Sequence, residues 1–204
     1  MSESIRLILA SGSPARLRTL RAAGLDPDVV VSGIDEGEIV ANSLPELVAE
    51  LSRKKATAVS DQLDPLRRPA VILGCDSMLE LDGVAHGKPA TAAQAVDRWR
   101  MMSGRTAMLL TGHHVIVRRA GETLTRSAVA TTTVHFAELT DGEIEAYVAT
   151  GEPMQVAGAF TIDGLGGAYV TGIEGDHHNV VGISLPLFRI MVAELGISWP
   201  SLWR

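Results

Sequence analysis

The sequence predicts an α/β protein, a twisted, mixed β-sheet flanked by helices, with two lobes around a central cleft. Apolar segments of strand length alternate along the chain with segments whose apolar residues recur at helical spacing, and turn residues separate the two kinds. Residues 70–75 form an uninterrupted apolar run, which is typical of a strand covered on both faces. Two longer segments of strand character, 107–118 and 123–136, are joined around Gly121.

The chain begins with a strand at residues 5–10, a turn of small residues and a helix. Pro14 suits the first position of a helix, which makes Ser13 the natural N-cap, and Gly24 ends the helix. Such a turn directs backbone N–H groups and the positive end of a helix dipole toward one point, which suits an anion. Two serine hydroxyls and Arg16 can add donors to a phosphate oxygen. An ordinary capped helix start explains this segment equally well, and the segment is not a Walker A loop.

A short strand at residues 29–31 leads to acidic residues that include Glu36, and a helix begins at Ser43, where Glu46 completes a capping-box pattern. At about 100° per residue, Lys55 falls within the apolar stripe of this helix. A lysine directed toward the interior either finds a partner or packs its stem while its ammonium group reaches water. The sequence leaves both explanations open.

The apolar run 70–75 ends abruptly at Asp76 and Ser77, which predicts a strand end at this point. In open α/β sheets ligands bind outside the carboxyl ends of strands, so Asp76 occupies a favoured position for chemistry. The alternative is a turn residue that accepts backbone N–H bonds. Nothing in the sequence around Cys75 activates its thiol, which favours a small buried hydrophobe over a nucleophile.

The remaining elements are predicted from their turn and cap residues. A two-residue hairpin turn at Asp82 and Gly83 is expected to direct Lys88 back toward the site. Further helices are predicted to begin at Thr91, Thr140 and Pro186. The glycine-rich segment 158–182 predicts tight loops that approach a ligand or each other.

Composition and charge exclude several classes of function. With 204 residues, of which 46% are hydrophobic and 21% charged, the chain is expected to fold as a single domain over residues 1–204. A net charge of −6 argues against a nucleic-acid partner. The sequence shows no signal-peptide pattern and no apolar run of bilayer length, so we expect a cytoplasmic protein with no membrane partner. A single cysteine agrees with a reducing compartment.

Two histidine doublets, His113-His114 and His177-His178, invite interpretation as a metal site. Neighbouring residues in a strand point to opposite faces, so neither doublet makes a chelating pair by itself. We therefore expect no zinc centre at these positions.

The chain offers the groups that triphosphate chemistry requires. Besides the turn of small residues, they are carboxylates at Glu36 and Asp76 and cations at Lys55, Lys88 and Arg105. Carboxylates hold a hard divalent ion through oxygen, while lysine and arginine neutralise phosphate oxygens and developing charge. Their spacing in the sequence does not by itself show that they converge.

A series of short motifs follows at fitting intervals along nearly the whole chain. They are Leu7 to Pro14 with Arg16, Asp35-Glu36, Lys55-Ala56, Gly74-Cys75-Asp76-Ser77, Gly87-Lys88-Pro89, Ser103-Gly104-Arg105, Thr111-Gly112, Gly151-Glu152-Pro153, and Glu174-Gly175 through Asn179-Val180-Val181-Gly182. In this order they resemble the Maf nucleotide pyrophosphatases, a family related in fold to the inosine triphosphate pyrophosphatases. The resemblance implies a house-cleaning or regulatory enzyme that cleaves a nucleoside triphosphate between its α and β phosphates, giving a monophosphate and pyrophosphate with a divalent metal, Mg²⁺ or Mn²⁺.

The resemblance also implies roles for individual residues. Asp76 is the expected proton acceptor that activates the attacking water, and Glu36 and Asp76 are the expected metal ligands. The expected phosphate contacts are Ser11, Ser13, Arg16, Lys55 and Lys88, and the residues expected near the base are Ser77 and Asp163. The implied partner is the nucleoside triphosphate substrate, and a homodimer is compatible with the sequence.

Three positions depart from the family pattern. Ala15 stands where a second arginine is usual, which removes one cation, and Ser77 stands where threonine is common, which keeps the hydroxyl. At the position of Asp163 the pyrimidine-selective branch carries glutamine and the 7-methyl-GTP branch carries glutamate. An ionised aspartate only accepts hydrogen bonds, so it is able to read an N–H group on uracil, thymine or guanine. The base preference is therefore not carried over.

Two other functions stay open at this level. Ala15 is the feature that supports a nucleotide-binding regulator, related to cell division, that hydrolyses little. A nucleotidyltransferase also uses a small-residue loop, a lysine and a carboxylate, and it would need a second substrate. An assay of pyrophosphate release with and without such a substrate separates the three functions.

Overall fold

The computed structural model describes residues 5–35, 37, 39, 41–63 and 69–204. The strands are β1 (Arg6–Leu9), β2 (Asp28–Val29), β3 (Ala70–Leu81), β4 (Val84–His86), β5 (Thr106–Arg119), β6 (Glu122–Phe136) and β7 (Val170–Glu174). The α-helices are α1 (Pro14–Ala22), α2 (Leu44–Gln62), α3 (Ala92–Met102), α4 (Asp141–Ala149), α5 (His177–Val181) and α6 (Leu185–Glu194). Short 3₁₀ helices are η1 (Glu152–Gln155), η2 (Ala157–Ala159), η3 (Leu165–Tyr169) and η4 (Trp199–Leu202). Among these residues no helix is both long and apolar enough to cross a membrane.

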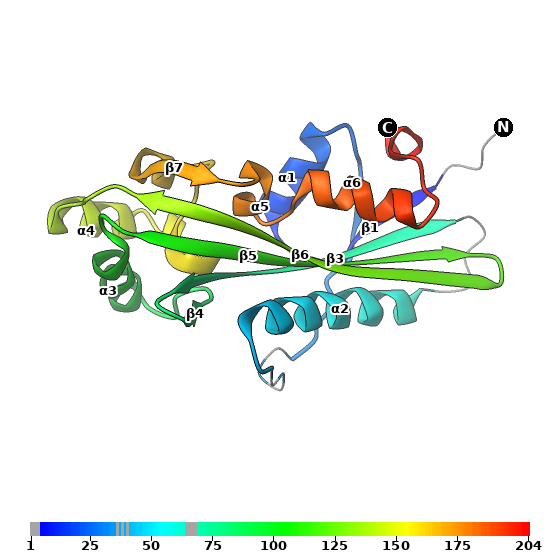
Figure 1. Cartoon of the computed structure of the whole chain (residues 1–204), viewed down its shortest axis with the longest axis horizontal. Helices are drawn as coiled ribbons and strands as arrows, with labels where there is room; N and C mark the ends of the chain where they lie inside the picture. Colours follow the sequence, from blue (N-terminus) through cyan, green and yellow to red (C-terminus); the bar gives the residue numbers. More distant parts are fainter. Residues whose placement is uncertain (1–4, 36, 38, 40, 64–68) are drawn as a thin grey trace. The chain divides into compact units, whose positions relative to one another are not determined.

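The strands form one seven-stranded sheet (Figure 1). Their order is β2-β1-β3-β5-β6-β7, and β4 pairs with β3. Strand β1 is parallel to both β2 and β3, whereas the pairs β3–β4 and β6–β7 are antiparallel. The sheet is therefore mixed and the protein belongs to the α/β class, as the sequence predicts.

The chain divides into two compact units. Unit 1 comprises Met1–Asp76, Thr111–Ala130 and Gly182–Arg204, and unit 2 comprises Ser77–Leu110 and Thr131–Val181. Strands β3, β5 and β6 contribute residues to both units. Two units agree with the two predicted lobes, while the cleft and the single domain over 1–204 stay predictions.

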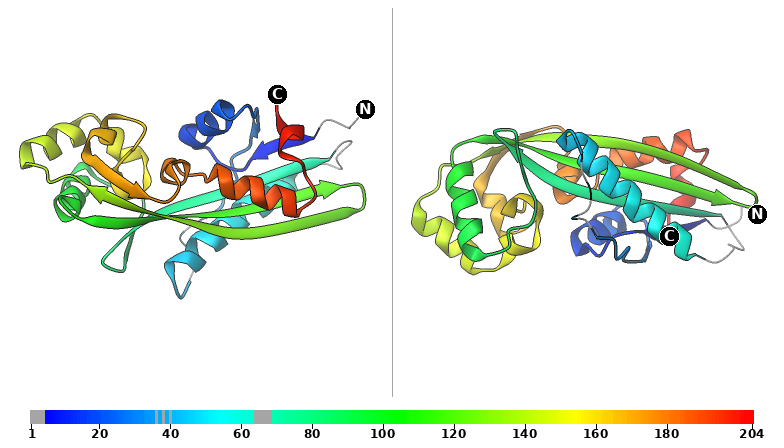
Figure 2. Two further views of the ribbon diagram at one scale, coloured as in Figure 1. Left: turned by 45° about the horizontal axis from the view of Figure 1, so that its top comes forward. Right: turned by 90° about the horizontal axis from the view of Figure 1, so that it is seen from below.

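In unit 1 both faces of the sheet are covered, with α2 on one face and α1 and α6 on the other (Figures 1 and 2). One core cluster includes Leu9, Leu73 and Phe188, and another includes Ile8, Ile72 and Val59. Successive residues of a strand thus belong to different layers, because side chains alternate between the faces of a sheet. This burial on both faces explains the uninterrupted apolar run at 70–75.

The core of unit 2 is built around Trp99, which is fully buried. Its indole packs edge to face against Phe136, Tyr147 and Tyr169, with ring centroids 5.4 to 5.8 Å apart. Its Nε1–H donates to the carbonyl oxygen of Ala159 at 2.7 Å. Aromatic contacts therefore hold α3, α4 and the glycine-rich segment of this unit together.

Local signals predicted most element boundaries correctly. The side chains of the predicted N-caps each accept a backbone N–H hydrogen bond; these are Ser13, Ser43, Thr91 and Thr140. Asp82 and Gly83 have φ angles of 53° and 75°, and positive φ at both positions is what a type I′ hairpin turn requires. The hairpin between β3 and β4 is therefore confirmed.

Two local predictions were wrong. Strand β3 does not end at Asp76 but continues to Leu81, because Leu79 and Leu81 are buried and pair with β4. The doublet His177-His178 lies in helix α5, so the argument from strand geometry does not apply to it.

Candidate active site

Asp76 is the buried carboxylate at the centre of the candidate site. Strand β1 pairs with β3 as far as Leu9 opposite Leu73, so Asp76 lies three residues beyond the last paired position. Beyond that position β1 has ended and the chain has turned into the small-residue loop. Asp76 is 6% exposed, and its Oδ1 forms an ion pair with the Lys55 ammonium group. Its Oδ2 is buried and has no hydrogen-bond partner in the described part of the chain.

Lys55 reaches Asp76 because α2 lies unusually close to β3. A Cβ atom on Gly74 would lie 2.3 Å from the Ser52 carbonyl oxygen and 2.9 Å from Ala56, so only glycine admits the helix at this distance. The Lys55 side chain is 11% exposed. Of the two explanations left open by the sequence, the structure supports a lysine with an internal partner.

The loop after β1 gathers serine and arginine side chains. Ser11 Oγ accepts the backbone N–H of Ser13 at 3.2 Å and the Arg16 Nη1–H at 3.0 Å. Arg16 is 9% exposed, and its Nε–H donates to the Gly182 carbonyl oxygen at 2.7 Å. Ser13 Oγ accepts the backbone N–H of Arg16 at 3.4 Å, which caps α1. The predicted turn therefore holds two serine hydroxyls and the Arg16 guanidinium in one hydrogen-bonded segment.

His113 holds the chain segment 182–184, whose Gly182 carbonyl oxygen accepts a hydrogen bond from Arg16. The sequence did not predict this role. Its ring is fully buried, its Nε2 accepts the backbone N–H of Ser184 at 2.9 Å, and its Nδ1 lies 3.0 Å from the Thr111 carbonyl oxygen. This pattern assigns the ring proton to Nδ1, which makes the imidazole neutral. Ser184 lies two residues after Gly182, so the histidine fixes the backbone that Arg16 binds. The doublet was visible in the sequence, but it suggested only a metal site.

Burial and three charged groups determine the pKa of the Cys75 thiol. Burial raises the pKa of its thiol to about 12, the positive charge of Arg16 and then of Lys55 lowers it, and the negative charge of Asp76 raises it. All three groups act on the thiol next to the candidate catalytic residue. Cys75 is fully buried, so the prediction of a small buried hydrophobe is confirmed.

A direct test of this environment is alkylation. We expect iodoacetamide at about pH 8 to leave Cys75 unmodified in the native protein and to modify it after unfolding, because an exposed cysteine has a pKa of about 8.5 and forms thiolate readily. Mass spectrometry of the intact chain measures the modification. Rapid labelling of the native protein would contradict both the burial and the raised pKa of this thiol.

The other predicted site residues lie elsewhere in the chain. Ser77, Lys88 and Asp163 belong to unit 2, where Lys88 and Asp163 are exposed. Glu36 lies outside the described residues. In unit 1, Ser11, Ser13 and Arg16 form one hydrogen-bonded group at the start of α1, and Lys55 on α2 pairs with Asp76 on β3. The functional roles of all nine predicted site residues stay predictions.

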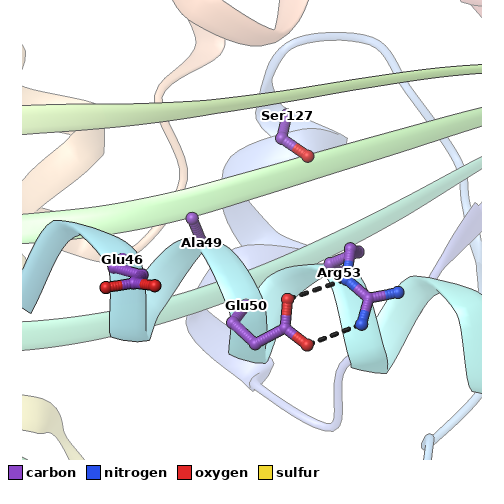
Figure 3. A pocket seen from close by; sticks show the side chains of 5 residues that line it. All are labelled: Glu46, Ala49, Glu50, Arg53 and Ser127. Carbon is purple, nitrogen blue, oxygen red and sulfur yellow. Dashed lines mark hydrogen bonds and ion pairs between the residues drawn. The ribbon is translucent and has the colours of Figure 1, made fainter. Parts of the chain in front are cut away.

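A separate hollow of about 310 Å³ lies between α2 and β6 (Figure 3). It is lined by Glu46, Ala49, Glu50, Arg53 and Ser127. The Glu50 carboxylate and the Arg53 guanidinium pair with each other at 2.5 and 2.8 Å. None of the predicted site residues that the structure describes lines this hollow. It is therefore not the candidate active site.

Fold and site together define a class of protein: an α/β protein with a buried carboxylate–lysine ion pair and a serine-lined turn that carries a buried arginine. The sequence matches the family described as Maf-like protein over residues 6–195. This match spans most of the chain. The chain belongs to the Maf family.

Curated relatives agree with this assignment. Over 200 residues the chain is 53% identical to the "Nucleoside triphosphate pyrophosphatase" of Salinispora tropica, covering 98% of this chain and 88% of the relative. It is 50% identical over 200 residues to the protein of the same name from Cutibacterium acnes, with 97% and 94% covered. Among solved structures, the Staphylococcus aureus Ham1 protein matches with a TM-score of 0.40 and 14% identity over 65% of this chain and 72% of that one. So distant a likeness identifies neither substrate nor mechanism.

Proposed function

We propose that this chain is a nucleoside triphosphate pyrophosphatase, a hydrolase that cleaves the phosphoanhydride between the α and β phosphates and releases a nucleoside monophosphate and pyrophosphate. Membership of the Maf family and the names of relatives at about 50% identity support this function. The single observation that supports it in the structure is the buried Asp76 carboxylate, whose one oxygen pairs with Lys55 and whose other oxygen has no hydrogen-bond partner among the described residues.

In this proposal Asp76 takes a proton from water. Its Oδ1 is occupied by the Lys55 ammonium group, so Oδ2 is the oxygen that remains to accept a proton. The water oxygen bonds to phosphorus, its proton passes to Oδ2, and the bridging P–O bond breaks to release pyrophosphate. Burial keeps bulk water away from the carboxylate and strengthens each electrostatic interaction around it.

The phosphates would be held by hydroxyls and cations. The proposed contacts are Ser11, Ser13, Arg16, Lys55 and Lys88, while Ser77 and Asp163 are proposed to lie near the base. Arg16 already donates from two of its nitrogens, to Gly182 and to Ser11, which fixes the plane of its guanidinium group. A fixed guanidinium loses little side-chain entropy when it binds an anion, which favours a pre-organised phosphate site.

A divalent cation fits this centre in one specific way. The described residues contain no group of three or more histidine, cysteine, aspartate or glutamate side chains that could hold a metal alone. Magnesium typically uses one or two protein carboxylates together with substrate phosphates, and the buried carboxylate of Asp76 suits that arrangement. Asp76, with Glu36 as the second proposed ligand, would hold Mg²⁺ or Mn²⁺, which neutralises phosphate charge when bound.

The test is a panel of canonical and modified nucleoside triphosphates, assayed for pyrophosphate release with Mg²⁺ or Mn²⁺. We expect turnover of at least one nucleotide, equimolar monophosphate and pyrophosphate as products, and loss of turnover with EDTA. Release of a nucleoside diphosphate and inorganic phosphate would contradict cleavage between the α and β phosphates. Tight nucleotide binding measured by calorimetry without turnover would favour the regulator instead.

The setting of this activity is part of the proposal. An acidic chain with a net charge of −6 suits a small-molecule substrate better than nucleic acid, and we place the enzyme in the cytoplasm as a house-cleaning activity. The sequence is compatible with a homodimer, and the molecular mass measured by analytical ultracentrifugation tests this.

A further inference from the structure

Glu152, at the start of η1, is a carboxylate of unit 2 that accepts four hydrogen bonds. One oxygen, Oε1, accepts from the Tyr147 hydroxyl at 2.9 Å, the Thr161 hydroxyl at 2.5 Å and the Gly166 backbone N–H at 3.0 Å. The other, Oε2, accepts from the Leu165 backbone N–H at 3.0 Å. Four donors from four residues therefore converge on one side chain.

These bonds fix the turn formed by residues 161–166. A Cβ atom on Gly164 would lie 2.6 Å from Glu152 Oε2, and a Cβ atom on Gly166 would lie 2.3 Å from the Tyr147 hydroxyl oxygen. Only glycine allows the backbone to approach the carboxylate and the phenol so closely. The conformation of the 161–166 turn therefore depends on the position of Glu152.

The charge state of Glu152 agrees with this role. Burial raises the pKa of its carboxyl group, but the hydrogen bonds from Thr161, Leu165, Gly166 and Tyr147 outweigh burial and hold that pKa below its usual value. At neutral pH the side chain is therefore a carboxylate that accepts from all four donors at once. The neutral amide of glutamine offers only one accepting oxygen in the same space.

On its outer side the 161–166 turn presents two groups suited to a ligand. Asp163 is exposed, and the neighbouring Leu165 is 60% exposed although it is a large apolar residue. An apolar side chain beside a carboxylate matches a nucleobase, which has a flat apolar face and N–H groups at its edge. The direction of both groups is set by the backbone that Glu152 holds.

We infer that Glu152 is a positioning residue for base selectivity, which acts by fixing the 161–166 turn and so the direction of Asp163. This inference rests on the proposed function, because it assumes a nucleotide substrate whose base meets the turn. Glu152 itself touches neither the phosphates nor the reacting atoms in this role. Its loss should therefore alter discrimination between bases and leave the handling of the phosphates intact.

The informative variant is Glu152→Gln, which keeps the size of the side chain. Wherever the amide NH₂ is placed, it faces at least one of the two backbone N–H groups, so one donor of the turn loses its acceptor. The measurement is kcat/KM for two triphosphates that differ only in the base, together with pyrophosphate inhibition as a readout of the phosphate contacts. We expect the selectivity ratio to fall about tenfold through KM, with kcat and pyrophosphate inhibition nearly unchanged.

Two further variants separate positioning from a general loss of structure. Glu143→Gln is the matched control, since Glu143 is also a hydrogen-bonded carboxylate of unit 2 but its partners belong to the capping box of α4. We expect it to leave the selectivity ratio unchanged. Tyr147→Phe removes one donor to Glu152 and keeps the carboxylate, so a smaller shift in the same direction is expected.

The outcomes distinguish this inference from the proposed function. An unchanged selectivity ratio in Glu152→Gln, or an equal loss for every nucleotide and for pyrophosphate, would overturn the inference while the proposed function stands. Absence of turnover in the unaltered protein would overturn the proposed function. In that case the same ratio is measured from the Kd values of α,β-methylene triphosphates, which do not require hydrolysis.

Discussion

Exchange of Asp76 for asparagine is expected to lower kcat by about 10²- to 10⁴-fold, the range that general acid–base catalysis typically contributes. Asparagine keeps the size of aspartate and an oxygen for the Lys55 ammonium group, but it takes up no proton at neutral pH. The buried Oδ2 would become either an amide nitrogen or a neutral oxygen. Initial rates of pyrophosphate release at saturating nucleotide measure the effect.

The matched control for this exchange is Asp82→Asn, which makes the same chemical change six residues along β3 and its turn. Asp82 is exposed and pairs with Arg105 at 2.5 Å. Its φ of 53° lies in the left-handed region, which asparagine tolerates well. We expect this variant to retain kcat. Equal activity of Asp76→Asn and the unaltered protein would remove Asp76 from the chemistry, provided that circular dichroism shows both to be folded.

The sequence predicted elements well where the determining interactions are local. A serine or threonine hydroxyl caps a helix three residues away, and an Asp-Gly pair with positive φ makes a hairpin turn by itself. The strand end at Asp76 was predicted wrongly because polar residues there looked like a terminus. In fact β3 continues past the end of β1, and Asp76 lies within β3, three residues beyond the last position paired with β1.

The candidate site was predictable in part. Lys55 stood out as a cation within an apolar stripe, and its partner proved to be the carboxylate that the motifs had already singled out. His113 and Glu152 were missed because their partners are far away in the sequence or are backbone groups. His113 binds a backbone N–H 71 residues away, and no periodicity or spacing indicates such a contact. The histidine doublet within a predicted strand and an acidic residue before the glycine-rich segment were the available sequence signals.

Substitution of Gly74 by alanine is expected to lower both stability and activity, because this glycine sets the distance between α2 and β3. The new Cβ would lie 2.3 Å from the Ser52 carbonyl oxygen, a backbone atom that moves only if the helix moves. We expect the free energy of unfolding to fall by about 3 kcal/mol, the upper part of the range for overpacked cores. At about 2–4 °C per kcal/mol for a chain of this size, a thermal melt resolves this change.

The activity of the same variant tests the link between packing and the charged centre. Lys55 is carried on α2 and Asp76 on β3, so a displaced helix lengthens their contact and exposes the carboxylate to water. Gly142→Ala is the matched control, because a Cβ there meets nothing within 4 Å, and in helix α4 alanine is favoured over glycine by about 1 kcal/mol. We expect the control to melt at the same or a higher temperature with full activity. A Gly74→Ala protein as stable and active as the control would mean that the close approach of α2 does not hold Lys55 against Asp76.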